Sequence, residues 1–416
     1  MLAQFHKDRR DRFTDAMKEG TFAALTSGEL VVSTNDENFR FEVDRNFYYL
    51  TGIDFPGITM IIEKEAARSP KTTLFVPRKD PDKEKWTGFI PSKEELSEKS
   101  MIDVSDIRYI DEFDPALTAL GEGERFTSCY AYFQDVPDNI PEPAANLLYY
   151  RLCDEYLDIE VEDIMEILRP MRSVKTPEEV DAIIESARIT DKAIRAVAKE
   201  LSCGLMEYEM SALFDYTVQR SGARNAFPTI SASGEYGTIL HYIDGENEIG
   251  EGDMLLLDCG AAKGWYNSDV TRTLPSGGKF DERQREIYSI VLEANKRVAE
   301  AARPGVTLTG LNDLTKEFLG GELRRIGLIS DDADLVKYYY HSVSHSLGLD
   351  THDPFSRDTP LEAGMVITDE PGLYIREWGI GIRIEDDLLI TDGGCRVLTD
   401  FIPREIEEVE AMVSKG

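Results

Sequence analysis

The spacing of apolar positions in the second half of the chain predicts long amphipathic helices followed by strands. After Thr176, apolar residues recur every three or four positions, as they do on one face of a helix. Thr176 and Glu179 have the spacing of a capping box, and Pro177 suits the first position of a helix. We expect a second helix after Gly204, and strands from there to about Leu274.

The same order of elements is expected a second time. Apolar spacing predicts a helix from about Glu282 to Ala302, another after Gly305, and strands beyond it. Two strand-like segments, "GDMLLLDCG" at 252–260 and "GMVITDEPG" at 364–372, also match. Their outer glycines and one acidic residue coincide at a constant spacing of 112 residues. Residues 175–405 are therefore predicted to contain two copies of a helix, helix and strand unit.

The first part of the chain has shorter and more mixed segments. "ITMIIE" and "TTLFVP" are typical of strands, whereas "SKEELSEK" and "PEPAANLLYYRLCDEY" are typical of helices. This mixture predicts an α/β domain over residues 1–165. The predicted helix start in "RSVKTPEEVDAII" marks a boundary, so we expect a second domain over residues 173–416.

Composition narrows the class of protein. Aspartate and glutamate total 79 against 46 for lysine and arginine, and a net charge of −33 disfavours nucleic acid because phosphates would be repelled. The five cysteines include no CxxC pair, which argues against a thiolate zinc site. No secretory signal and no apolar run long enough to span a membrane is found. We therefore expect a cytoplasmic enzyme or binding protein that binds neither nucleic acid nor membrane.

Two predicted hairpins place acidic residues opposite each other. Asp258 ends the apolar run "MLLL", where a buried carboxylate is costly unless it is paired or bound to metal. A two-residue turn at 263–264 would pair Asp258 with Asp269 across the first hairpin. A turn at 377–378 would likewise pair Glu370 with Glu385 across the second. Like charges that face each other in a sheet repel, so something must offset the repulsion.

Divalent cations would offset this repulsion, since carboxylate oxygens are good ligands for hard cations. Two alternatives stay open at this point. The acids could be ordinary surface charges of an acidic protein, although four of them in register across a repeat disfavour that interpretation. One pair could instead share a proton, but this arrangement does not account for both pairs at once.

Histidines are scarce in this sequence and concentrated near the acids. Of the five, three lie in "HSVSHSLGLDTHDP" at 341–354. His345 is the best candidate for a nitrogen ligand, with His341 and His352 beside it, and His241 precedes the first acidic hairpin. A lone histidine is more often an ordinary core or surface residue. Four of five near the acidic hairpins instead favour a functional site.

These residues resemble the metal-ligand set of the "pita-bread" metallopeptidases, which include methionine aminopeptidase, prolidase and aminopeptidase P. The matching set is Asp258, Asp269, His345, Glu370 and Glu385. It lies in "LLLDCGAAKGWYNSDVTRT", "HSVSHSLGLDTHD", "TDEPGLYI" and "GIGIRIEDD". The resemblance implies an α/β (α+β) chain in which an N-terminal α/β domain precedes a pita-bread catalytic domain with a pseudo-twofold repeat.

The N-terminal half narrows the resemblance to the proline-specific members. "DRNFYYLTGI" at 44–53 and "RKDPDKEKWTG" at 78–88 are similar to the N-terminal domain of aminopeptidase P and prolidase. This similarity implies an Xaa-Pro aminopeptidase, which releases the N-terminal residue from peptides with proline in second position. A prolidase is the alternative. A non-catalytic peptide-binding protein on the same fold is a more remote one, because the ligand set is complete.

The resemblance also implies the cofactor and the chemistry. Two divalent cations are expected to share Asp269 and both glutamates, with Asp258 completing one site and His345 the other. A hydroxide that bridges the cations would attack the carbonyl group before proline. Hard oxygen ligands suit manganese, and cobalt or zinc can take its place.

The resemblance also implies roles for individual residues. Glu370 is expected to accept and then donate the catalytic proton, while His241 and His352 donate hydrogen bonds to the developing oxyanion. His341, Tyr374 and Arg383 are expected to line the proline site, although Arg383 could equally be a structural partner of the acids. Trp86 is expected to flank the substrate channel, from a neighbouring subunit of a homodimer or homotetramer.

Overall fold

A computed structural model describes residues 1–123, 125–137 and 140–413 of the chain, and it divides into two compact units, 1–170 and 171–416. The dividing point falls within helix α7 (Met165–Ser173), which covers the interval between the two domain spans expected from the sequence. Residues 414–416 of the second expected span lie outside the described residues.

The first unit is built on one mixed sheet of six strands. In spatial order these are β6 (Ile107–Tyr109), β5 (Lys71–Val76), β4 (Thr59–Lys64), β1 (Thr21–Thr26), β7 (Ser128–Ala131) and β8 (Glu160–Asp163). The β1–β4 and β4–β5 pairs are antiparallel, whereas β1–β7, β7–β8 and β5–β6 are parallel. Every residue of β1 is buried, so both faces of the sheet are covered.

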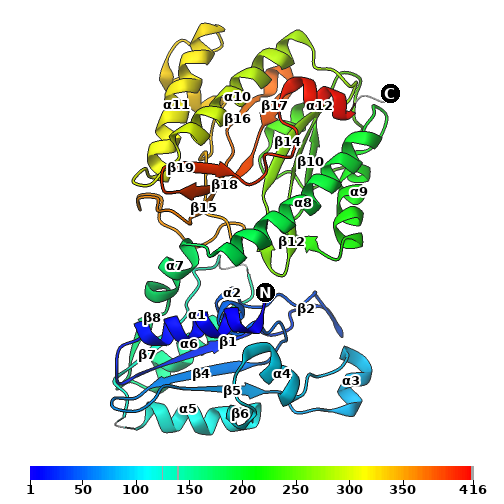
Figure 1. The fold of residues 1–416 in the computed structure, drawn as a ribbon. Helices are drawn as coiled ribbons and strands as arrows, with labels where there is room; N and C mark the ends of the chain where they lie inside the picture. The colour runs from blue at the N-terminus through cyan, green and yellow to red at the C-terminus, as the bar shows by residue number, and fades with distance from the viewer. Residues whose placement is uncertain (124, 138–139, 414–416) are drawn as a thin grey trace. The chain divides into compact units, whose positions relative to one another are not determined.

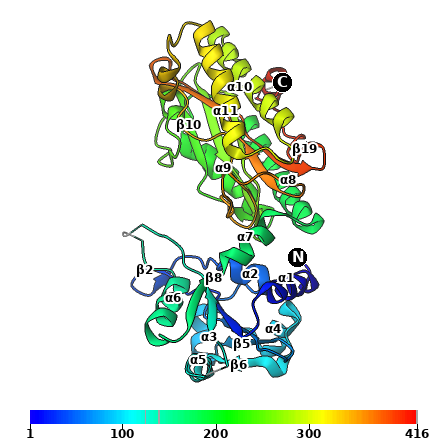
Figure 2. The ribbon, with the colours of Figure 1, turned by 90° about the vertical axis from the view of Figure 1, so that its left-hand side faces the viewer.

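Helices cover this sheet on both sides. Side chains of α5 (Phe113–Gly121) and α6 (Ala144–Glu155) pack on one face in a shared hydrophobic core. Figure 2 shows α1 (Ala3–Ala16) on the side of the sheet opposite α6. The remaining elements are α2 (Arg45–Thr51), α3 (Pro81–Thr87), α4 (Lys93–Ser100) and the short hairpin of β2 (Val32–Thr34) and β3 (Glu37–Asn38). The strands and helices predicted from the four quoted segments are all present.

The second unit repeats one order of elements. Helices α8 (Pro177–Glu200) and α9 (Glu207–Arg220) precede the first group of strands, and α10 (Glu282–Ala301) and α11 (Leu308–Arg325) precede the second. These helices and α12 (Ile406–Val413) lie outside the strands (Figure 1). The predicted start of α8 is confirmed, because the backbone N–H of Thr176 donates to the Glu179 carboxylate at 2.9 Å.

The strands of the second unit form two similar antiparallel arrangements. In the first, β11 (Met254–Cys259) pairs with β14 (Val270–Pro275) and β10 (Ile230–Ser233), and the hairpin continues into β12 (Ala261–Lys263) and β13 (Tyr266–Asn267). In the second, β15 (Val366–Asp369) pairs with β18 (Asp386–Thr391), which pairs with β19 (Gly394–Val397). Its hairpin continues into β16 (Gly372–Ile375) and β17 (Ile380–Arg383). The predicted repeat is therefore present.

Among the described residues, no helix is both long and apolar enough to cross a membrane.

Candidate metal centre and active site

The second unit contains a cavity of about 770 Å³ that gathers most of the residues singled out in the sequence. Its lining includes all four acids and four of the five histidines: Asp258, Asp269, Glu370, Glu385, His241, His341, His345 and His352, together with Arg383. Tyr374 is buried behind the wall and contacts it by hydrogen bonds. Trp86 belongs to α3 of the first unit, where its side chain is 86% exposed.

The predicted register of the first acidic hairpin is wrong. Asp258 lies opposite Thr271, and Asp269 lies two residues nearer the turn. The turn is centred on Gly264 and Trp265, one residue later than expected, and both have positive φ, 59° and 70°. Because this shift moves the pairing by two residues, the side-chain face is preserved. Asp258 and Asp269 are therefore diagonal neighbours on one face rather than a directly opposed pair.

The predicted register of the second hairpin is confirmed. Asp369 pairs with Asp386 on one side of the acids and Gly372 pairs with Arg383 on the other. Glu370 and Glu385 therefore occupy opposed positions between these two pairs. The glutamates come from the connections between β15 and β16 and between β17 and β18, where the sheet opens toward the cavity.

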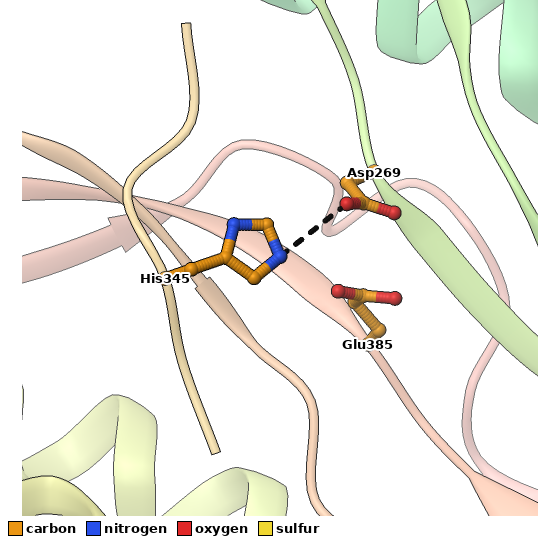
Figure 3. A group of neighbouring side chains, drawn as sticks. All are labelled: Asp269, His345 and Glu385. Atoms are coloured by element: carbon orange, nitrogen blue, oxygen red, sulfur yellow. Dashed lines mark ion pairs between the residues drawn. The ribbon is translucent and has the colours of Figure 1, made fainter. Parts of the chain in front are cut away.

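One histidine points its free lone pair at the acids. The Nδ1 atom of His345 donates to the carbonyl oxygen of Ser346 at 3.1 Å, which leaves Nε2 unprotonated. That Nε2 atom lies 3.5 Å from Oδ2 of Asp269 and 3.7 Å from Oε1 of Glu370 (Figure 3). Ligand atoms of Asp269, His345 and Glu385 all lie within 4.8 Å of one another. This spacing suits a bound cation.

The carboxylates also resist ionisation in the absence of a cation. Burial, then repulsion from Glu385 and other neighbouring acids, raises the pKa of Asp269 well above its usual value. Burial and Glu385 likewise raise the pKa of Glu370. The pKa of Glu385 rises to about 8 through burial and Asp258. The buried Oδ1 atom of Asp258 has no hydrogen-bond partner among the described residues. Hard oxygen donors, one imidazole and several buried carboxyl groups that repel one another when ionised together fit divalent cations.

A chain of hydrogen bonds lines the wall beside the acids. The Nδ1 atom of His341 donates to the carbonyl oxygen of Ser342 at 2.8 Å, so its Nε2 accepts from the Tyr374 hydroxyl, also at 2.8 Å. The Tyr374 oxygen in turn accepts from Nη1 of Arg383 at 2.9 Å. Burial and then Arg383 lower the pKa of His341 to about 3. His341 is therefore a neutral hydrogen-bond acceptor at this wall.

Arg383 and Thr271 connect this wall to the acids. Arg383 donates to Asp258 through Nη2 and to the Thr271 hydroxyl through Nε at 3.1 Å. Thr271 then donates to Oε2 of Glu385 at 2.7 Å. Sequence reasoning missed Thr271, although it lies two residues from Asp269 on the same strand face. It also missed Asp387, whose Oδ2 accepts from the backbone N–H of Asp269 at 3.4 Å.

The two remaining histidines lie at the open side of the cavity. The His352 ring packs against the His345 ring, with 4.1 Å between centroids. Burial and then His241 lower the pKa of His352. Both His241 and His352 are exposed, in contrast to the more buried His341 and His345.

Comparison with known proteins identifies the family to which this chain belongs. The sequence pattern of metallopeptidase family M24 matches residues 181–392, which is half of the chain and covers all five candidate ligands. The chain belongs to metallopeptidase family M24. The pattern of the aminopeptidase P N-terminal domain matches residues 6–129. An M24 metallopeptidase with this N-terminal domain is the architecture that the sequence resemblance implied, and the mixed α/β fold is confirmed.

Individual M24 relatives resemble the chain over nearly its whole length. The Xaa-Pro aminopeptidase of Escherichia coli is 31% identical, over 97% of this chain and 96% of its own. A Bacillus anthracis structure described provisionally as an aminopeptidase P has a TM-score of 0.94 at 38% identity, covering 99% and 98%. Zinc-substituted E. coli aminopeptidase P in complex with product has a TM-score of 0.91 at 29% identity, covering 99% and 98%. These relatives favour the aminopeptidase over the prolidase alternative.

Proposed function

We propose that this chain is a metal-dependent Xaa-Pro aminopeptidase that releases the N-terminal residue from peptides with proline in second position. The observation that carries the proposal is the joint presence, in one cavity, of four carboxylates and the unprotonated Nε2 of His345. The similarity to Xaa-Pro aminopeptidases, which extends through both units, supports it.

The metal centre is proposed to hold two divalent cations. Asp269, Glu370 and Glu385 would be shared between them, with Asp258 and His345 as the individual ligands. The preponderance of carboxylate oxygens favours manganese, while cobalt or zinc would also bind such a set. When bound, the cations supply Lewis-acid activation of a water molecule near neutral pH.

The chain's own residues would handle the proton and the oxyanion. Glu370 lies 3.7 Å from Nδ1 of His341 and from Nε2 of His345, and is proposed to take up a proton and return it to the proline nitrogen. His241 and His352 are proposed to donate hydrogen bonds to the carbonyl oxygen as it gains charge. Both histidines line the cavity together with the ligands, and His352 packs against His345, which supports this role.

The proline site is proposed to lie against His341, Tyr374 and Arg383. Proline has no amide N–H and a fixed φ, so an enzyme can recognise it by shape rather than by a hydrogen bond to that nitrogen. Arg383 already donates to Asp258, Thr271 and Tyr374, which makes it a poor anchor for a dipeptide carboxylate. This commitment supports an aminopeptidase rather than a prolidase. The channel role of Trp86, the homo-oligomer and the cytoplasmic location remain predictions.

A peptide series tests the proposal directly. With manganese present, we expect higher kcat/KM for Ala-Pro-Ala than for Ala-Pro, and no cleavage of Ala-Ala-Ala. A clear preference for Ala-Pro would move the assignment to a prolidase, and rapid cleavage of Ala-Ala-Ala would reject the proline site. Metal analysis of the same preparation should give about two ions per chain, whereas none would favour a non-catalytic binding protein.

A further inference from the structure

The loop that carries His352 is held by a buried cluster of charges. Between Leu347 and Pro354 the chain has no helix or strand, yet hydrogen bonds hold its backbone in place. The backbone N–H of Asp353 donates to Ser346 at 2.9 Å, and that of Asp350 donates to the Asp353 carboxylate at 3.2 Å. His352, between these two acids, therefore takes its position from how the Asp353 side chain is held.

Two cations hold that carboxylate, one on each oxygen. Arg172 lies 2.6 Å from Oδ1 of Asp353, and Lys175 lies 3.1 Å from Oδ2. The three side chains are at most 2% exposed. Arg172 also lies 2.6 Å from Oδ2 of Asp350, so it binds the two acids on either side of His352.

The surroundings leave this cluster little freedom. A Cβ atom on Gly348 would lie 2.7 Å from Oδ2 of Asp353, so the loop fits around the carboxylate without spare space. The backbone of Lys175 is anchored as well, because its N–H donates to the carbonyl oxygen of Gly364 at 2.8 Å. Lys175 therefore acts from a fixed position just before α8, and Arg172 from the last turn of α7.

Buried ion pairs contribute little net stability compared with well-packed apolar groups, and they are better suited to fixing one geometry. We propose that Arg172 and Lys175 are positioning residues, which set His352 against His345 at the mouth of the cavity by holding Asp353. Neither cation lines the cavity among the described residues, so their effect on turnover would pass through the loop. This inference rests on the catalytic role proposed for His352.

A double-mutant cycle separates positioning from general stabilisation. The variants are Lys175→Met, His352→Ala and the two combined, with Lys296→Met as a control. Lys296 forms a partly exposed ion pair with Glu405 in the same unit, so its replacement removes an equal charge outside the loop and the cavity lining. Each protein is assayed with Ala-Pro-Ala in manganese below its own melting temperature, and its metal content is measured.

We expect Lys175→Met to lower kcat about 10- to 100-fold, as is usual for residues that orient a functional group. KM and metal content should stay near wild type. In the His352→Ala background the same substitution should cost less than about threefold, because the group it positions is already absent. Lys296→Met should not change the activity.

The alternative outcomes are distinct. Equal losses in both backgrounds would overturn the inference and leave the cluster a purely structural role, as would an unchanged kcat in Lys175→Met. Wild-type kcat in His352→Ala would overturn the proposed role of that histidine as well. If Lys175→Met does not fold, Arg172→Lys keeps the buried charge but shortens the side chain whose Nη2 atom contacts both Asp350 and Asp353. It should show the same dependence on His352.

Discussion

The Nε2 atom of His345 faces Oδ2 of Asp269 across 3.5 Å, with no proton available on the imidazole to join them (Figure 3). The single ring proton of neutral His345 lies on Nδ1, which donates it to the carbonyl oxygen of Ser346. Burial and then His352 lower the pKa of His345 to about 3, so the ring stays neutral near pH 7. Either a bound cation or the proton that Asp269 retains without one must lie between these two atoms.

Asp269→Asn tests whether that cation depends on the carboxylate. The substitution keeps the size of the side chain and removes one charge from the centre of the ligand set. We expect metal content to fall and kcat to drop by at least about 100-fold, because metal activation of water is lost. Metal analysis and an Ala-Pro-Ala assay measure the two effects.

Asp244→Asn is the matched control, since Asp244 is exposed on the loop that carries His241. It should bind metal and turn over like the wild type. Full activity of Asp269→Asn in metal-free buffer would reject the metal centre.

The raised carboxyl pKa values predict how stability depends on pH without metal. Glu385 has a pKa of about 8 when folded, against roughly 4.3 for an unperturbed glutamate. Between these values the folded state binds more protons than the unfolded state. The free energy of unfolding therefore falls as pH rises through this window. Calorimetry of chelator-treated protein from pH 5 to pH 8 should show the melting temperature falling.

Two comparisons assign that slope to the cluster rather than to the overall charge of −33. Glu385→Gln removes one titrating group at nearly constant shape, so its melting temperature should fall less steeply over the same range. Manganese should raise the melting temperature of the wild type most at pH 8, because binding favours the ionised, folded form. Parallel slopes in the two proteins would contradict the shifted pKa.

The two acidic hairpins show how far sequence alone could define the site. In the second, the αL residue that closes the turn is Gly379, as turn chemistry favours, and the predicted register is correct. In the first, Trp265 has a φ of 70°, which a bulky residue rarely adopts. Arg224 stacks 3.4 Å from the Trp265 ring, a long-range contact that sequence spacing does not reveal. The side-chain face survived the error because the shift was an even number of residues.

Long-range partners account for the rest of what sequence reasoning missed. Asp353 and Lys175 are 178 residues apart, and each looks like an ordinary charge in its own segment. Arg383 was open to either a substrate role or a structural one. Its contacts with Asp258 and Tyr374 come from folding and depend on distant strands meeting at one wall. Residue types and short spacings predict ligands well, but they do not predict what holds the ligands in place.

The three acceptors of Arg383 predict that lysine does not replace it. A guanidinium group reaches Asp258, Tyr374 and the Thr271 hydroxyl at fixed angles, whereas a lysine ammonium is a single point on a flexible stem. Both Arg383→Lys and Arg383→Met should therefore lower kcat by at least about tenfold. Steady-state kinetics would measure this fall in kcat. Near-normal kcat in Arg383→Lys would mean that only the positive charge matters.

The last prediction concerns Glu207, a buried acid at the start of α9 that fastens the loop of His241. Its carboxylate accepts from the Ser233 backbone and hydroxyl at 2.6 and 2.7 Å and from the Tyr242 hydroxyl at 3.0 Å. It also accepts from the backbone and side-chain nitrogens of Asn247, at 3.2 and 3.1 Å. Every one of these contacts requires an acceptor, which only a carboxylate offers at both ends.

Glu207→Gln should therefore turn one acceptor oxygen into a donor and leave at least one buried hydrogen bond unmade. We expect the free energy of unfolding to fall by about 2–3 kcal/mol in urea titrations. Because the loop carries His241, kcat should fall as well, while metal content stays at the wild-type level. Glu209→Gln is the matched control: Glu209 is exposed two residues later on the same helix, where an amide oxygen can still accept from the Met206 backbone. A loss of metal in Glu207→Gln would instead link this loop to the ligand set, and an unchanged kcat would separate the loop's position from catalysis.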